Sequence, residues 1–200
     1  MSHITPVAFD IESLLTQFNA DQWFDRYWQA LSEENQKVNL VSRETTTEKF
    51  RRIVAEALVP FAQSKSADGR YLDIGSGGGI PAIPLILSGV TTGSEALYER
   101  TKKKALALNR ICSKLRISDC KVVAESFGEN QPKHKFDLVT LSWVTLTPDL
   151  FRSIEKVMAP NSKLIYYSKP IFEIPGHSVS IFSYSQTPAD IHKYFSIITK

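Results

Sequence analysis

A glycine-rich turn constrains this chain more than any other part of its sequence. Four of the five residues from 75 to 79 are glycine. The turn follows a predicted strand at 70–74 and precedes a predicted helix near 80–88. A nucleotide-binding loop needs glycines there, because side chains would keep a ligand away from the backbone amides. The segment therefore predicts such a loop, and a merely tight strand-to-helix turn is the less favoured interpretation.

An acidic residue follows this loop at the distance that a sugar contact requires. Glu99 ends the next predicted strand, 20 residues after Gly79, where its carboxylate can accept hydrogen bonds from ribose hydroxyls. A dinucleotide fingerprint would have its third glycine where Ile80 stands, and a Walker loop would have Lys-Ser or Lys-Thr after the glycines. The sequence has neither pattern.

The spacing of the loop is similar to that of another motif. Asp73 and the alternating glycines at 75, 77 and 79 resemble the first motif of S-adenosylmethionine-dependent methyltransferases with a Rossmann-like fold. An acid at this position suits a cofactor that carries an ammonium and a sulfonium, and it would repel a pyrophosphate. The expected cofactor is therefore S-adenosyl-L-methionine rather than a nicotinamide dinucleotide.

The rest of the chain after residue 67 alternates short apolar runs with helical stretches. The predicted strands are 70–74, 96–99, 121–124, 136–141 and 163–167. The predicted helices lie near 80–88, 102–115 and 147–158. This alternation indicates a parallel α/β sheet, and two further strands at 178–184 and 194–199 are expected to form an antiparallel hairpin at its edge.

The first third of the chain has a helical pattern. One predicted helix begins with Asp21 as its cap, and another follows Thr45, with Glu48 completing a capping box. A polar, small-residue run at 64–69 marks the best boundary. We therefore expect a helical N-terminal cap over 1–66 and an S-adenosylmethionine-binding domain over 67–200, together forming one compact unit.

Composition narrows the class of protein. The chain has 200 residues, of which 42% are hydrophobic and 22% charged, as in ordinary globular domains. No stretch reaches the roughly 18 consecutive apolar residues of a membrane span. Cys112 and Cys120 fit packing positions in a reducing cytosol, and the histidines show no metal-ligand spacing. We expect a cytoplasmic monomer with no membrane partner and no metal.

Positive charge is concentrated in one segment. The formal charge of the chain is only +3, but residues 99–121 hold eight basic and two acidic side chains. A local surplus of this kind suits a phosphate-bearing partner, and a solvated helix face is the alternative. The candidate RNA-contacting residues are Arg43, Arg51, Arg52, Arg100, Lys102, Lys103 and Lys104.

Most of the chain resembles one family, from about Val38 to Pro170. The matching segments are Asn39–Ser42, Arg52–Leu58, Asp73–Leu85, Glu99–Lys104, Ala124–Phe127 and Ser168–Pro170. They are similar to segments of the small-subunit (16S) ribosomal RNA guanine-7 methyltransferases, also called the glucose-inhibited division protein B family. The segment Asp73–Leu85 is the most specific match.

The resemblance implies an α/β fold, namely the mostly parallel Rossmann-like sheet of class I methyltransferases with an antiparallel C-terminal hairpin. It also implies ribosomal RNA or a small-subunit precursor as partner. The expected donor contacts are Asp73, Gly75, Ser76, Gly77, Gly79, Ile80, Glu99, Ala124, Glu125 and Trp143. Nitrogen 7 of guanine has an in-plane lone pair, so transfer needs no base. No catalytic residue is assigned, and Ser142, Trp143 and Lys169 are candidates for the substrate side.

The chain departs from the family pattern at two positions. Ile53 stands where the family has histidine, and Trp143 stands where it has arginine. An indole can stack on a purine or lie against a sulfonium, but it cannot donate the paired hydrogen bonds of a guanidinium. The alternatives are therefore a methyltransferase for another RNA or a small molecule, and a non-catalytic donor-binding interaction module.

Overall fold

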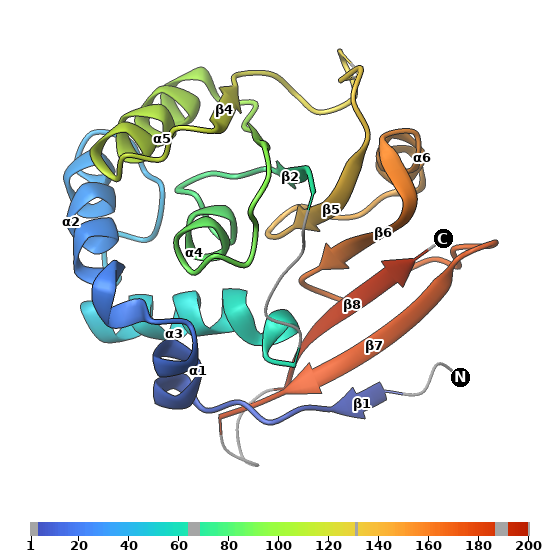
Figure 1. The fold of residues 1–200 in the computed structure, drawn as a ribbon, viewed down its shortest axis with the longest axis horizontal. Helices are drawn as coiled ribbons and strands as arrows, with labels where there is room; N and C mark the ends of the chain where they lie inside the picture. Colours follow the sequence, from blue (N-terminus) through green and yellow to red (C-terminus); the bar gives the residue numbers. More distant parts are fainter. Residues whose placement is uncertain (1–3, 64–68, 131, 187–191, 200) are drawn as a thin grey trace.

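A computed structural model describes residues 4–63, 69–130, 132–186 and 192–199 of the chain. Its centre is an eight-stranded sheet in the order β1-β7-β8-β6-β5-β2-β3-β4 (Figure 1). The strands are β1 (Ile4–Pro6), β2 (Tyr71–Ile74), β3 (Glu95–Tyr98), β4 (Cys120–Val123), β5 (Phe136–Leu141), β6 (Met158–Tyr166), β7 (Ser178–Tyr184) and β8 (Lys193–Thr199). Strands β2 to β6 pair in parallel, whereas β8 is antiparallel to both β6 and β7. The predicted α/β sheet with an antiparallel C-terminal hairpin is confirmed.

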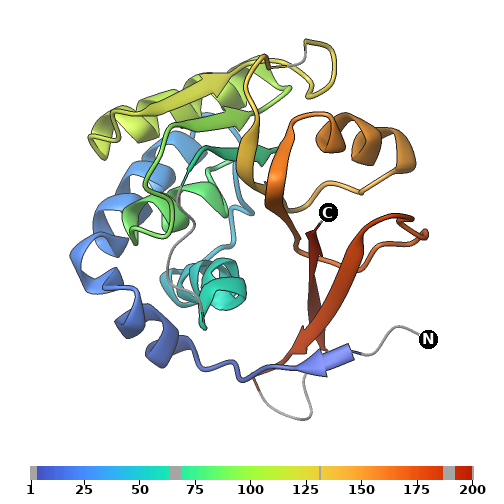
Figure 2. The same cartoon turned by 45° about the vertical axis from the view of Figure 1, so that its right-hand side comes forward.

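Helices lie on either side of this sheet. They are α1 (Ile11–Gln17), α2 (Phe24–Asn35), α3 (Thr47–Leu58), α4 (Ala82–Leu87), α5 (Lys102–Lys114) and α6 (Pro148–Glu155). Figure 2 shows α1 and α2 in blue along one side of the molecule, with α6 and the C-terminal hairpin on the opposite side. Among the described residues, no helix is long and apolar enough to cross a membrane.

The two predicted N-terminal caps are wrong in detail. Asp21 lies in a short 3-10 turn (Ala20–Gln22), and α2 starts after Trp23 without a side-chain cap. Helix α3 is capped by Thr46, whose hydroxyl accepts from the Lys49 amide at 3.2 Å, rather than by Thr45. Two adjacent threonines offer the same chemistry, so only the backbone geometry selects between them.

The N-terminal third is not wholly helical, because it also contains β1. This three-residue strand pairs in parallel with β7 and makes the sheet eight-stranded instead of seven-stranded. All three of its residues are exposed, so no apolar alternation marks it in the sequence. The boundary before β6 was also predicted wrongly. The helix expected over 147–158 ends at Glu155, and β6 already begins at Met158 instead of at residue 163.

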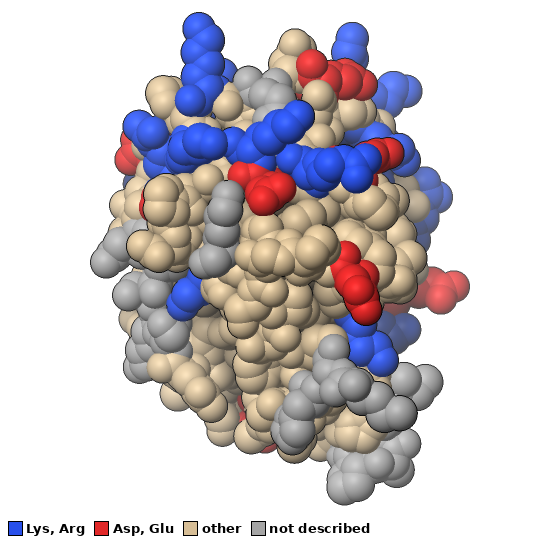
Figure 3. Space-filling view, turned by 90° about the vertical axis from the view of Figure 1, so that its right-hand side faces the viewer, with Lys and Arg blue, Asp and Glu red and all other residues tan. Residues whose placement is uncertain are grey.

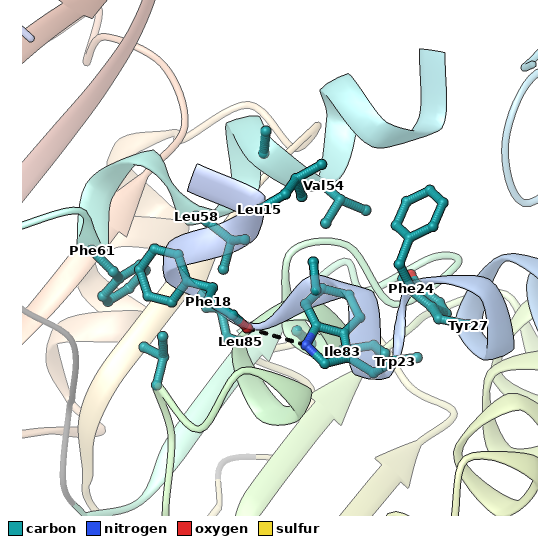
Figure 4. Close-up of a cluster of buried hydrophobic side chains, with 14 of the residues drawn as sticks. Leu15, Phe18, Trp23, Phe24, Tyr27, Val54, Leu58, Phe61, Ile83 and Leu85 are labelled. Atoms are coloured by element: carbon teal, nitrogen blue, oxygen red, sulfur yellow. Dashed lines mark hydrogen bonds between the residues drawn. The ribbon is translucent and has the colours of Figure 1, made fainter. Parts of the chain in front are cut away.

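The N-terminal helices and α4 bury one apolar cluster together. Side chains from α1, α2, α3 and α4 meet in it, and Tyr27, Leu58 and Ile83 are fully buried (Figure 4). The indole nitrogen of Trp23 donates to the Phe18 carbonyl oxygen at 3.3 Å, so its polar atom is satisfied inside the cluster. Residues on both sides of the expected boundary at 64–69 therefore contribute to one core.

The carboxyl ends of the parallel strands place the loops of interest together. Residues 75–79 follow β2, residues 99–101 follow β3, and residues 142–145 follow β5. Since β2 pairs with both β3 and β5, these three loops meet at one edge of the sheet, where ligands of open α/β sheets bind.

Candidate functional site

The glycine loop turns tightly beside β3. The amides of Gly75 and Ser76 both donate to the carbonyl oxygen of Tyr98, at 2.8 and 3.0 Å. Gly77 has a φ of +51°, and a Cβ built on it would meet only the Gly75 carbonyl oxygen, at 3.8 Å. The backbone at Gly77 therefore faces open space, which a side chain would fill.

Glu99 faces the same space from the end of β3. One of its carboxylate oxygens accepts from the Gly77 amide at 3.0 Å, and the other accepts from the Thr101 amide at 2.8 Å. The residue is 6% exposed. A carboxylate has about four acceptor positions, so this one is held in place and can still accept hydroxyl hydrogens from a sugar.

A cavity of about 860 Å³, called here the first cavity, opens between these elements. Of the expected donor contacts, Gly75, Ser76, Gly77, Ile80, Glu99, Glu125 and Trp143 line it. Tyr98, Ser126 and Phe127 complete the side of β3 and of the loop after β4. The arrangement brings together most of the predicted contacts at the carboxyl ends of four neighbouring strands, β5, β2, β3 and β4.

Asp73, Gly79 and Ala124 do not line the first cavity. Asp73 is 1% exposed and lies inside the sheet, where the Thr140 hydroxyl donates to its Oδ1 at 2.5 Å. Its other oxygen has no partner among the described residues, and burial raises the pKa of this carboxyl to about 6. A Cβ at Gly79 would meet Ile83 at 2.4 Å, so this glycine serves the packing of α4. Ala124 is exposed outside the cavity.

A smaller cavity of about 410 Å³, called here the second cavity, adjoins the first. Five residues line both cavities: Ile53, Ile80, Trp143, Val144 and Thr145. We call these five the shared wall. Trp143 is 85% exposed and has a φ of +58°, a left-handed backbone that is strained for a bulky residue. The residue lines both cavities and is largely open to solvent.

The substrate-side candidates lie at different distances from these cavities. Ser142 is buried and lines the second cavity, as Trp143 does. Lys169 lines neither cavity, and its ammonium lies 3.9 Å from the centre of the Tyr194 ring. That ring is part of the wall of the second cavity, so Lys169 supports this wall from behind.

The predicted RNA-contacting residues fall into three groups. Arg100 and Lys104 line the first cavity, while Lys102 and Lys103 are exposed at the start of α5. On the N-terminal side, Arg43 is exposed. The other two arginines there are already paired, Arg51 with Glu12 at 2.6 Å and Arg52 with Glu56 at 3.1 Å. Of the four basic residues at 100–104, Arg100, Lys102 and Lys103 are exposed and Lys104 is half-buried.

A further basic surface was not predicted. Figure 3 shows a band of Lys and Arg across the upper part of the face that carries α6. Four basic residues are exposed near β5 and α6. Lys133 and Lys135 precede β5, Arg152 lies in α6, and Lys156 follows it. They are separated in the sequence by an apolar strand, so no charge run marks them. Arg152 pairs with Asp149 in its own helix.

Sequence reasoning also missed several residues that line the first cavity. Leu40, Val41, Ser42 and Thr45 contribute from the connection between α2 and α3. The side chain of Asn35 fixes this connection by accepting from the amides of Leu40 and Val41, at 2.8 and 3.0 Å. The only signal for it was the resemblance of residues 39–42 to a family segment, to which no role had been given.

A comparison with models of protein families shows to which family this chain belongs. Residues 20–185 match the GidB model, described as rRNA small subunit methyltransferase G. The chain belongs to this family. Two relatives named ribosomal RNA small subunit methyltransferase G are 25% identical over 166 residues, from Thermoanaerobacter sp. (strain X514), and 27% identical over 162 residues, from Cereibacter sphaeroides. The matches cover 79% and 78% of this chain, and 62% and 78% of those proteins. This GidB-family chain therefore spans about three fifths of the first relative.

Solved structures agree with the GidB assignment at the level of the fold. An O-methyltransferase from Bacillus cereus in complex with SAH has a TM-score of 0.62 at 15% identity, over 96% of this chain and 100% of that one. An rRNA methylase from Streptococcus thermophilus has a TM-score of 0.55 at 10% identity, over 74% and 96%. The fold is the Rossmann-like fold of class I methyltransferases.

Proposed function

We propose that this protein is an S-adenosylmethionine-dependent methyltransferase that acts on nitrogen 7 of a guanine in small-subunit (16S) ribosomal RNA. Membership of the GidB family supports the substrate class. The observation that carries the proposal is the pair of adjoining cavities: the glycine loop and Glu99 line the first, and a shared wall connects it to the second. This arrangement provides one site for a methyl donor and one for an acceptor.

The residues of the first cavity fit S-adenosylmethionine. The open space over Gly77 is a cradle that any Cβ would fill, and Glu99 offers carboxylate oxygens to a ribose. When bound, the donor would supply a methyl carbon attached to a positively charged sulfur. The lone pair of nitrogen 7 would form the new bond to this carbon, and the electron pair of the broken carbon–sulfur bond would stay on sulfur. The chain's own task is to hold the acceptor in line with this carbon.

The shared wall suits a reaction that removes no proton. None of its five residues, Ile53, Ile80, Trp143, Val144 and Thr145, has an ionisable side chain. Nitrogen 7 of guanine carries no hydrogen, so its methylation needs orientation and not a general base. Three side chains of the wall are aliphatic, and the exposed Trp143 indole offers a face on which a base can stack.

The basic residues support an RNA substrate. Lys102 and Lys103 are exposed at the start of α5, beside the mouth formed by Arg100 and Lys104. Lysines and arginines position RNA through its phosphates without reading the sequence. The band on the face of α6 (Figure 3) offers further contacts to a large RNA. We also propose that the protein acts in the cytoplasm, on the RNA or on a small-subunit precursor, as a monomer.

One specific observation favours a second candidate function. Trp143 and Ile53 are the two departures from the family pattern, and both lie in the shared wall. A changed wall between donor and acceptor suits a methyltransferase with another RNA or a small molecule as substrate. A donor-binding interaction module without transfer is the remaining alternative.

The experiment uses the purified protein, methyl-labelled S-adenosylmethionine and RNA from unmethylated small subunits. We expect label in the RNA, and 7-methylguanosine after digestion to nucleosides. Label in a different nucleoside or in a small molecule would replace the proposed substrate. If the protein binds S-adenosylhomocysteine in calorimetry but transfers no methyl group from the labelled donor to any acceptor, the non-catalytic interaction module is the alternative that remains.

A further inference from the structure

The second cavity contains a buried carboxylate for which methyl transfer has no use. Glu56, on α3, lines this cavity and has a side chain only 10% exposed. Both of its oxygens accept from the Lys193 ammonium at 2.7 Å, and one also accepts from Arg52 at 3.1 Å. Two cations from different elements thus hold this carboxylate at a fixed place in the wall.

The walls around Glu56 suit a flat aromatic ring. Tyr166, Tyr167, Tyr184 and Tyr194 line the second cavity, and Trp143 lies at its junction with the first. Aromatic side chains stack on nucleobases of any kind because every base has a π-face. Stacking therefore explains how a base is held here, but it does not explain how one base is chosen over another.

Glu56 belongs to the part of the second cavity that is not shared with the first. Ile53 belongs to the shared wall, whereas Glu56 lines the second cavity alone. The two residues are three positions apart on α3, which separates their Cβ atoms by about 5–6 Å. A purine that presents nitrogen 7 to the shared wall turns its Watson–Crick edge away from it, toward the part of the cavity that holds Glu56.

Guanine matches the groups found there. Its Watson–Crick edge carries two adjacent donors, the N1 hydrogen and the 2-amino group, beside the O6 acceptor. A carboxylate accepts about four hydrogen bonds and donates none. Glu56 already accepts three, from Lys193 and Arg52, so its Oε2 can accept one more, from the 2-amino group, while the Lys193 ammonium can donate to O6. Adenine presents an unprotonated N1 at the same place, which a carboxylate repels.

We infer that Glu56 is the residue of the second cavity that selects guanine, by accepting a hydrogen bond from the 2-amino group of the acceptor base. The inference rests on the proposed function, because it takes the second cavity as the acceptor site. The rival account gives Glu56 a structural role alone, as the anchor that joins α3 to β8 through Lys193.

Inosine separates the two accounts, since it retains nitrogen 7 and the N1 hydrogen but lacks the 2-amino group. The probes are two oligouridine nine-mers, one with a central guanosine and one with a central inosine. Binding is measured by fluorescence anisotropy with S-adenosylhomocysteine present, and methyl transfer is measured with the labelled donor. We expect the wild-type protein to bind the guanosine nine-mer roughly tenfold more tightly, as for the loss of one hydrogen bond to a charged group.

Glu56→Gln should reduce this ratio to about one, because an amide group offers a hydrogen to the 2-amino group in place of an acceptor. The matched control is Glu34→Gln. Glu34 is also a buried helical carboxylate with basic partners, Arg110 and Lys37, but it lines neither cavity. The control should keep the wild-type ratio. Circular dichroism and calorimetry with S-adenosylhomocysteine show whether each variant retains its fold and the first cavity.

Several outcomes would overturn the inference. A wild-type ratio near one does so without any variant, even if Glu56→Gln fails to fold. Equal loss of both nine-mers in Glu56→Gln, with the ratio unchanged, gives Glu56 the structural role alone. The proposed function can fail separately: a large ratio that depends on Glu56, without transfer to any RNA, would leave guanine selection intact and remove the methyltransferase.

Discussion

The buried carboxyl of Asp73 should make the stability of this protein depend on pH. The residue is 1% exposed, and one of its oxygens has no partner among the described residues. Burial raises its pKa from 3.8 to about 6, and the nearby charge of Glu99 adds to the effect, against the neighbouring Ser76 hydroxyl and the hydrogen bond from Thr140. The perturbation is Asp73→Asn, which keeps the shape of the side chain and removes the titrating proton.

The sign follows from where the proton is held. Between pH 3.8 and 6 the folded state retains a proton that the unfolded state has released, so the free energy of unfolding falls as pH rises through this range. The shift corresponds to a cost of about 3 kcal/mol once both states are ionised, as at pH 8. At pH 5 the cost is only about half as large, because the folded state is still mostly protonated.

The assay is urea unfolding of the wild-type protein and of Asp73→Asn at pH 5 and pH 8. The difference in unfolding free energy between variant and wild type should move by about 1 kcal/mol in favour of the variant between these two pH values. Glu95→Gln provides a comparison. The pKa of Glu95 is raised to about 7, so the difference in unfolding free energy between wild type and this variant should continue to change up to a higher pH than for Asp73→Asn. A difference between wild type and Asp73→Asn that is the same at both pH values would refute the reasoning.

Three further predictions concern the first cavity and its basic rim. Gly77→Val should abolish S-adenosylhomocysteine binding in calorimetry while the circular dichroism spectrum is retained. The control Gly89→Val, at a similar φ of +71° and in equally open surroundings, should leave the affinity unchanged. Unaltered binding by Gly77→Val would exclude the glycine loop as the donor site. Glu99→Ala should weaken this ligand by about 1–3 kcal/mol but barely affect methionine alone; equal losses would mean that Glu99 only supports the fold. Removing Lys102 and Lys103 should each lower the log–log salt slope of RNA binding by roughly one unit or less; unchanged RNA affinity across salt would make them a solvated helix face.

The glycine loop and Glu99 could be predicted because their information is local. A turn that needs glycines must show them consecutively, and an acid at the end of the next strand lies at a distance fixed by one helix and one strand. The seven longer strands were also predictable, since each contains a short apolar run or an apolar–polar alternation, although the first residue of β6 was assigned to a helix. β1 was not, because its three exposed residues owe their conformation entirely to pairing with β7.

The orientation of Asp73 could not be read from its position in the motif. Adjacent residues of a strand point to opposite faces, but which face meets a cavity depends on the strand's neighbours. Here β5 places Thr140 opposite Asp73, and their hydrogen bond keeps the carboxyl inside the sheet. The second cavity was equally inaccessible, because its wall combines α3, the loops after β5 and β6, and the hairpin β7–β8.

The contact between α2 and the glycine loop shows that the N-terminal helices are part of the site. The Tyr27 hydroxyl donates to the Gly78 carbonyl oxygen at 2.9 Å, inside the core. A Cβ on Gly78 would approach the Leu31 side chain to 2.9 Å, so α2 fits against the loop without room for any side chain at this position. Since packed interiors transmit such displacements rather than absorb them, a change in the seating of α2 must move Gly77 and the Glu99 hydrogen bond with it. The helical N-terminal segment therefore sets the shape of the first cavity and does not merely cover it.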